Sequence, residues 1–69
     1  MNQVARDLIR FTDESGYLDR AGFESVHPMS ESLLHTLEML EKQGLVLTDR
    51  DGTGTIVDYE PSSRLLKLR

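Results

Sequence analysis

SESLLHTLEMLEKQGLVLTDRDGTGTIVDY, residues 30–59, is the stretch that decides the fold. Its first half carries apolar residues at three- and four-residue spacing, which is typical of one face of a helix. A glycine follows, and then two runs rich in β-branched residues flank Asp51-Gly52, a dipeptide that favours a tight hairpin turn. The stretch therefore predicts a helix followed by a β-hairpin.

The helix is expected to begin at Pro28 or Ser30 and to end at Gln43, because proline and serine are both favoured at helix starts. Gly44 suits the left-handed conformation that often follows a helix. At about 100° per residue, one side of this helix is apolar and the other polar. The apolar side comprises Leu33, Leu37 and Leu40, with Leu34 at its edge. The polar side is centred on His35 and includes Glu31, Ser32, Glu38, Met39 and Lys42.

The rest of the chain is expected to complete a small domain around this core. Apolar spacing predicts a first helix over residues 3–13, stopped near Gly16, and a short extended piece at residues 17–18. Asp19 is a suitable cap for a second helix over residues 20–26, with Ala21 and either Phe23 or Val26 facing inward. The hairpin strands are expected at residues 45–48 and 55–59, with Pro61 ending the second.

A final turn is expected after the hairpin, capped by Ser62 or Ser63. Leu65, Leu66 and Leu68 in this turn need apolar cover. Two alternatives remain open for them, packing on the first helix or on another chain.

The order helix, short strand, helix, turn, helix, hairpin resembles the winged helix-turn-helix superfamily. The most telling part is Leu37-x-x-Leu40-Glu41-x-x-Gly44-Leu45-Val46, which is similar to the end of the recognition helix and the entry to the wing in small bacterial and archaeal regulators. The resemblance implies one α+β domain over residues 1–69, with three helices and a C-terminal β-hairpin wing. It also implies that the short strand near Leu18 pairs with the hairpin.

The resemblance also implies a function. The exposed side of the third helix would enter a major groove, and the hairpin tip, residues 50–53, would touch the DNA backbone or minor groove. The base rate of the superfamily favours a DNA-binding transcriptional regulator or an accessory factor acting on DNA. A homodimer could form through the first helix and Leu65, Leu66 and Leu68. The candidate nucleic-acid or partner-binding residues are Ser30, Ser32, His35, Thr36, Glu38, Met39, Lys42 and Arg50. For Met39, a place at the edge of the core under the wing is favoured over a binding role.

The charge distribution supports an alternative. Residues 25–60 carry two basic residues against seven acidic ones, a net charge of −5, whereas residues 61–69 carry three basic residues and no acidic one. Binding to duplex DNA depends on neutralising phosphates, so this surface would be repelled unless the basic N- and C-terminal segments lie beside it or a dimer adds positive charge. The alternative is a protein-interaction winged helix that docks a basic partner on an acidic surface formed by the third helix and the wing.

The composition of the chain excludes several other classes of protein. With 69 residues the chain is one small domain, and the absence of cysteine removes disulfides, thiolate metal sites and cysteine nucleophiles. No apolar run approaches the roughly 18 residues of a membrane span, and the charged N-terminus is unlike a signal peptide, so a cytoplasmic protein is expected. No activated nucleophile or paired carboxylate is apparent, so neither catalysis nor a cofactor is predicted.

A metal site is the most specific chemical alternative that the sequence offers. His27, Glu31, His35 and Glu38 are spaced four, four and three residues apart and would share one side of a helix extended back to His27. Pro28 disfavours a helical conformation at His27. A solvated helix surface is therefore favoured over a metal site.

Overall fold

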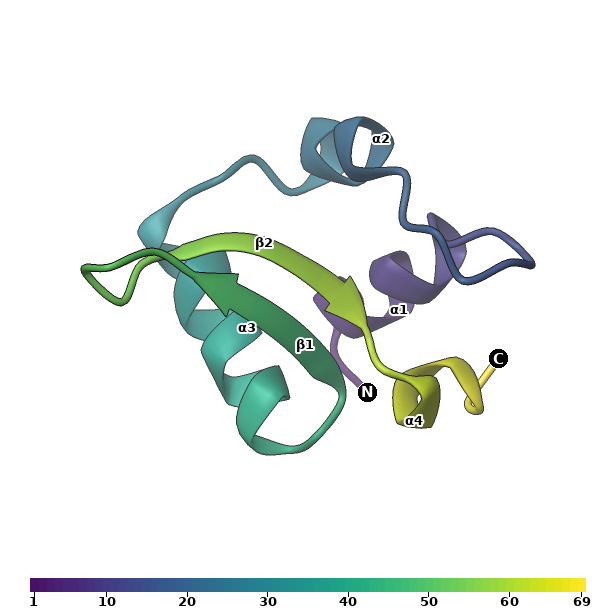
Figure 1. Ribbon diagram of the computed structural model, residues 1–69. Coiled ribbons are helices and arrows are strands. Elements are labelled where there is room, and N and C mark those ends of the chain that lie inside the picture. The colour runs from purple at the N-terminus through teal and green to yellow at the C-terminus, as the bar shows by residue number, and fades with distance from the viewer.

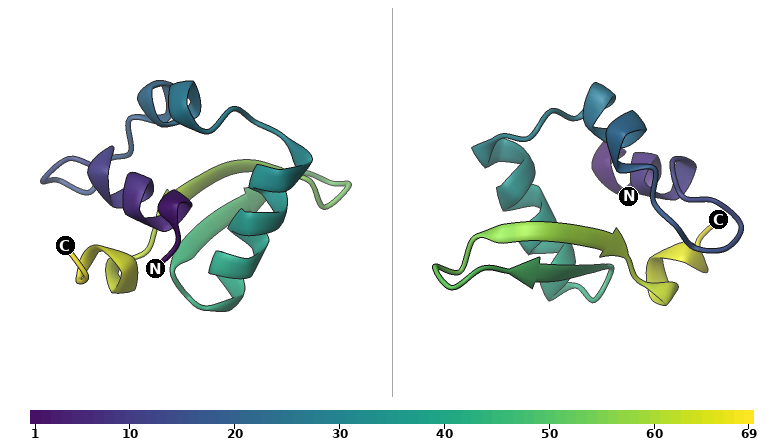
Figure 2. Two further views of the ribbon diagram at one scale, coloured as in Figure 1. Left: turned by 180° about the vertical axis from the view of Figure 1, so that it is seen from behind. Right: turned by 45° about the horizontal axis from the view of Figure 1, so that its top comes forward.

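The computed structural model describes all of residues 1–69, which form four helices and one antiparallel hairpin (Figure 1). The helices are α1 (Gln3–Arg10), α2 (Arg20–Val26), α3 (Glu31–Lys42) and α4 (Ser63–Leu66), and the strands are β1 (Val46–Arg50) and β2 (Ile56–Pro61). The α+β class is confirmed, with a short fourth helix where a final turn was predicted. In both views of Figure 2, α1 and α3 lie on the same side of the hairpin, and no helix covers the other side.

The core lies between α3, the hairpin and the N-terminal helices. The predicted apolar side of α3 is confirmed, because Leu33, Leu37 and Leu40 are all buried. Phe23 is fully buried at the centre, with its ring centroid 5.0 Å from that of His27 and 5.9 Å from that of Tyr59. The other buried apolar residues are Ala5, Leu8, Val46, Ile56 and Leu65.

The predicted ends of α3 are confirmed by its caps. Ser30 is the N-cap, because its hydroxyl oxygen accepts a hydrogen bond from the Leu33 N–H at 3.1 Å. After the last helical residue, Gly44 adopts a left-handed conformation with φ of +76°. The Leu45 N–H then donates to the Leu40 carbonyl at 2.9 Å, which turns the chain into β1.

Replacing Gly44 with alanine is expected to lower the free energy of unfolding by about 1–2 kcal/mol, the cost of a left-handed conformation with a Cβ. The added Cβ would also lie 3.2 Å from the Arg64 guanidinium. Gly52 at the hairpin tip is the matched control, since its φ is not positive and a Cβ there meets nothing within 4 Å. Urea denaturation of both variants measures the difference, and equal losses would contradict this account of Gly44.

The N-terminal part differs from the sequence prediction in two ways. Helix α1 ends at Arg10 and not at Asp13, because the Thr12 hydroxyl donates to the Leu8 carbonyl and residues 13–17 form a turn around the Asp13 side chain. Leu18 makes an isolated bridge with Thr12, so the short strand folds back on the end of α1. The prediction that it pairs with the hairpin was wrong, and the sheet has two strands.

Helix α2 has the predicted bounds and the predicted cap, with the Asp19 carboxylate accepting from the Gly22 N–H at 3.0 Å. Only Phe23 points into the core. Ala21 and Val26 are exposed, so an inward position for Ala21 was wrong.

The hairpin register places Leu47 opposite Glu60, Thr48 opposite Tyr59 and Asp49 opposite Asp58. The next pair is Arg50 with Ile56, so Val57 is an extra residue on β2, a β-bulge. Tight turns at the tip complete the hairpin: the Asp51 N–H donates to the Thr55 carbonyl at 2.9 Å.

Hydrogen bonds from side chains close the free edge of β2. Arg20 Nη1 donates to the Val57 carbonyl at 3.0 Å, and the Asp58 carboxylate accepts from the Tyr59 N–H at 2.9 Å. Pro61, the last residue of β2, has no N–H. Arg20 of α2 therefore occupies part of the edge of β2 at which a third strand could otherwise pair.

The C-terminal turn packs on the chain itself. Ser62 caps α4 by accepting from the Leu65 N–H at 3.2 Å, and Leu65 is buried in the core, where α4 contacts α1. Leu65 is therefore not accessible for the predicted homodimer contact, whereas Leu66 is half-buried and Leu68 is exposed.

Candidate functional site

The exposed side of α3 carries four of the eight predicted site residues as accessible side chains. They are Ser32, His35, Met39 and Lys42. Met39 is half exposed, so its favoured place under the hairpin was wrong. Ser30 and Thr36 have structural roles: Ser30 is the N-cap, and the Thr36 hydroxyl donates to the Ser32 carbonyl at 3.0 Å.

Arg50, at the end of β1, is held against α3 by carboxylates. Its Nη2 donates to Glu41 Oε1 at 2.8 Å, and its Nη1 lies 3.8 Å from Glu38 Oε1. The same Nη1 donates to the Gly54 carbonyl at 2.8 Å. The Thr48 hydroxyl donates to the other carboxylate oxygen of Glu41. The cation expected to contact DNA is therefore shared between two carboxylates and a carbonyl of its own chain.

Electrostatics reinforce this contact. The Thr48 hydroxyl, followed by the Arg50 guanidinium, lowers the pKa of Glu41, and Glu41 in turn raises the pKa of Arg50. Glu41 therefore stays ionised at neutral pH, and a phosphate that approached Arg50 would compete with it. The hairpin tip adds negative charge, because hydrogen bonds from the Thr53 hydroxyl and from backbone N–H groups lower the pKa of Asp51.

The basic C-terminal segment reaches α3 at one point only. Arg64 Nη1 donates to the Gln43 carbonyl at 2.7 Å, which places a guanidinium beside the end of α3 that carries Lys42. Arg69 lies elsewhere, since its Nη2 donates to the Asp13 carbonyl at 2.9 Å. The segment therefore does not supply a continuous basic surface along α3.

The residues considered as metal ligands are separated in the structure. His27 Nε2 lies 2.7 Å from Asp7 Oδ2 in a partly buried contact between the C-cap of α2 and helix α1, and His27 is outside α3. His35 is exposed on α3, one turn beyond Glu31. No group of three or more His, Cys, Asp or Glu side chains is arranged to hold a metal ion.

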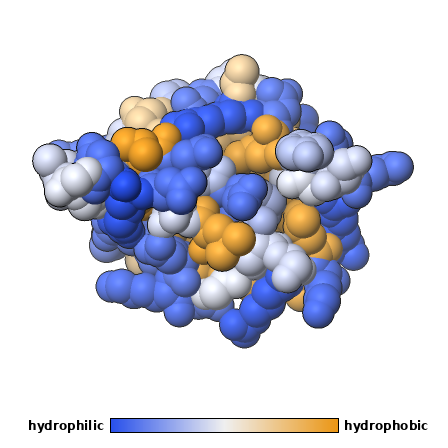
Figure 3. Space-filling view, viewed as in Figure 1, coloured by the Kyte–Doolittle hydropathy of each residue, from blue (hydrophilic) through white to orange (hydrophobic).

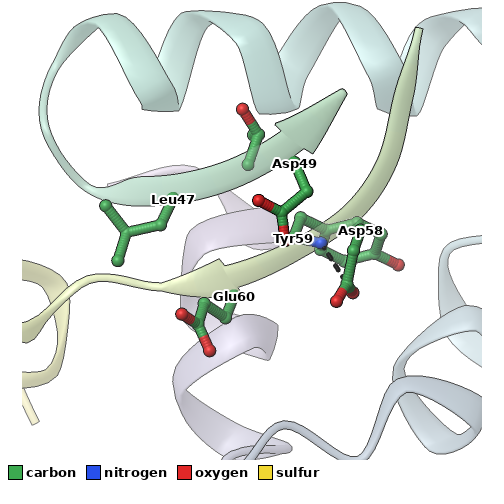
Figure 4. A pocket seen from close by; sticks show the side chains of 6 residues that line it. Leu47, Asp49, Asp58, Tyr59 and Glu60 are labelled. Carbon is green, nitrogen blue, oxygen red and sulfur yellow. Dashed lines mark hydrogen bonds between the residues drawn. The ribbon is translucent and has the colours of Figure 1, made fainter. Parts of the chain in front are cut away.

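A second surface, which the sequence analysis did not single out, lies on the opposite side of the hairpin from α1 and α3. We call it the outer face, and it consists of Leu47, Asp49, Asp58 and Glu60, which are all exposed. Leu47 pairs with Glu60 and Asp49 with Asp58, so the four side chains project from the same side of the two strands (Figure 4). Three of the seven acidic residues between positions 25 and 60 are thereby gathered on this face.

The outer face is shallow, and its three acidic side chains surround one apolar side chain, Leu47. A hollow of about 160 Å³ lies over it, lined by these four residues together with Thr48 and Tyr59. Figure 3, which looks onto this side of the molecule, shows apolar patches separated by hydrophilic side chains. Asp58 forms an ion pair with Arg20 at 3.2 Å, whereas Asp49 and Glu60 form none.

The sequence contained part of the signal for this face. Leu47 and Asp49, like Asp58 and Glu60, are two residues apart, the spacing of side chains on one side of a strand. Only the register shows that the two pairs face each other, and the bulge at Val57 shifts that register by one residue beyond Asp58.

Comparison with known proteins gives no match to any family model, to any curated protein or to any solved structure. None of the four helices has the length and apolar character required to cross a membrane.

Proposed function

We propose that this chain is a non-catalytic winged-helix module that binds a basic segment of a partner protein. The observation that carries the proposal is the engagement of Arg50, the only basic residue of the hairpin, by Glu41 and Glu38. With this cation occupied, the hairpin offers carboxylates to a partner. An acidic surface favours a basic partner and repels nucleic acid.

The winged-helix assignment rests on the order of elements. Three helices precede a hairpin, α3 is the longest helix, and Ser32, His35 and Met39 on its polar side are exposed. The arrangement departs from the superfamily because its sheet has only two strands. At the edge of β2 where a third strand would pair, the Arg20 side chain makes the contact. The assignment is therefore part of the proposal, together with the protein-binding function.

A second candidate function is DNA binding as a transcriptional regulator or an accessory factor acting on DNA. The accessible Ser32, His35 and Met39 on α3 favour it, since an exposed helix of this kind suits a major groove. Lys42 and Arg64 at the end of this helix could contact phosphates.

Titration with duplex DNA at low salt, followed by backbone amide shifts, separates the two candidates. No shift in residues 30–55 is expected under the proposal, because electrostatic attraction to DNA is strongest at low salt and is missing here. Saturable shifts along α3 and the hairpin tip would contradict the proposal and support DNA binding.

The double variant Glu38→Gln, Glu41→Gln sharpens this test. It frees Arg50 and removes two negative charges, so any DNA binding should strengthen several-fold, while binding of a basic partner should weaken through the loss of long-range attraction. Glu31→Gln is the single-charge control on the same helix, because Glu31 is exposed and makes no ion pair. Unchanged or tighter binding of a basic partner by the double variant would contradict the proposal.

A further inference from the structure

We infer that the outer face of the hairpin is the docking surface, and that it takes a basic segment of another protein in which lysine or arginine residues flank an apolar side chain. The inference rests on the proposed function for the class of partner. It places the contact on Leu47, Asp49, Asp58 and Glu60 and not on α3.

The outer face of the hairpin is not covered by any helix (Figure 2). One side of the hairpin packs on α1 and α3, while the other carries no helix in either view of Figure 2. Leu47 lies on the uncovered side with 54% of its surface exposed, directly opposite Glu60. An apolar side chain seated on Leu47 would remove surface from water that the chain itself leaves exposed.

The outer face also brings like charges close together. Asp49 and Asp58 are direct cross-strand partners, and Glu60 is two residues from Asp58 on the same side. Like charges directly opposite one another destabilise a sheet. Arg20 relieves Asp58 only, at 3.2 Å, and it also bonds to Glu24 at 2.6 Å. A partner cation between Asp49 and Glu60 would remove the repulsion that remains.

The carboxylates of α3 and those of the outer face differ in how many of them already have a cation partner. The carboxylates of α3 that face the hairpin, Glu38 and Glu41, already share Arg50. The outer face keeps two carboxylates without an ion pair, so it is the stronger attractor of positive charge. Strands of five and six residues extend for about 17–20 Å, which suits one short segment and is too small for a whole globular partner.

A second copy of the chain is a weaker occupant. Its basic segment is residues 61–69, but Arg64 donates to the Gln43 carbonyl and Arg69 to the Asp13 carbonyl of their own chain. Lys67 alone would be free to face the carboxylates of a neighbour. Charge complementarity therefore favours a different protein.

The experiment uses a nine-residue lysine peptide with a central leucine as the probe, and the same peptide with a central glycine as its control. Amide shifts at low salt are expected to be largest in residues 46–49 and 57–60, with tighter binding of the leucine peptide. The double variant Asp49→Asn, Glu60→Gln should weaken binding roughly 2- to 30-fold, the range for two exposed ion pairs. Leu47→Ser should weaken binding of the leucine peptide and leave the glycine peptide unchanged.

The matched control is the double variant Glu31→Gln, Glu38→Gln, which removes the same charge from α3. It should change the affinity much less, and an equal loss would overturn the inference by showing attraction to net charge alone. Shifts confined to α3 would overturn the location while leaving the proposed function standing. No binding of either peptide at low salt would overturn the proposed function itself. Self-association that shifts the same hairpin residues, measured by sedimentation, would identify a second copy and overturn the choice of partner.

Discussion

Replacing Phe23 with alanine is expected to remove a large part of the stability of the protein, at least about a third of it. The side chain is fully buried and packs edge-on against Phe11 and Tyr59, at centroid distances of 6.4 and 5.9 Å. Truncation of a buried phenylalanine costs about 3–5 kcal/mol. A domain of 69 residues has a total stability of only about 3–10 kcal/mol. The loss of helical circular dichroism and a urea titration of the variant measure the effect.

Val26→Ala, in the same helix α2, is the matched control. Val26 is half exposed, so its truncation should change the free energy of unfolding by no more than about 0.5 kcal/mol. A cooperative unfolding transition of Phe23→Ala at nearly the wild-type urea concentration would refute the central role assigned to Phe23.

The Asp7–His27 contact is expected to have the second largest effect. Asp7 is only 4% exposed, and its carboxylate accepts from Gln3 at 3.1 Å and lies 2.7 Å from His27 Nε2. Asp7→Asn keeps the shape but removes the charge, so a loss of about 1–3 kcal/mol is expected, the range for a hydrogen bond to a buried charged group. Chemical denaturation at pH 7 measures this loss.

The same contact predicts how stability depends on pH. The hydrogen bond with His27 is the main cause that lowers the pKa of Asp7 below its ordinary value of 3.8. Because the unfolded chain binds a proton more readily, the contribution of Asp7 is fully present above about pH 4 and is lost as the pH falls through the lowered folded value.

Glu24, Glu41 and Asp51 also have lowered pKa values, so the wild type should lose stability in acid for several reasons at once. The difference between wild type and Asp7→Asn isolates the contribution of Asp7 and should shrink as the pH falls below about 4. Glu14→Gln, an exposed carboxyl change, is the control. A difference that stays constant over this range would show that Asp7 acts through packing alone.

The elements that the sequence predicted well are those whose signals are local. Ser30 and Asp19 cap α3 and α2 as expected, because a cap needs only its own side chain and the next three residues. The leucine spacing of α3 was sufficient for its buried side, since Leu33, Leu37 and Leu40 share a face in any straight helix. Gly44 ended the helix for an equally local reason, its positive φ.

The misplaced features depend on contacts between distant residues. The pairing of Leu18 with Thr12 depends on the turn between them, which the Asp13 side chain organises. The local pattern of residues 17–18 predicts an extended segment but does not indicate which segment it pairs with. The contact between His27 and Asp7 joins residues 20 positions apart. Because of this contact, His27 does not share a helix surface with His35, as a metal site would have required.

The candidate site shows the same limit. Composition located negative charge within residues 25–60 but could not divide it between two sides of the hairpin. That division follows from the register, which sets Asp49 opposite Asp58, and from Arg50 reaching Glu41 nine residues back along the chain. A pairing between strands and an ion pair across a turn become visible only when the backbone path is known.

The closed edge of β2 also bears on how the protein behaves at high concentration. A two-stranded sheet without such protection can recruit further strands and grow into ordered aggregates. On the β2 side, growth would require breaking the Arg20 bond to Val57 and the Asp58 bond to Tyr59, and Pro61 could still contribute no donor. Fibril formation by strand addition at β2 is therefore suppressed by the same arginine that joins α2 to the sheet.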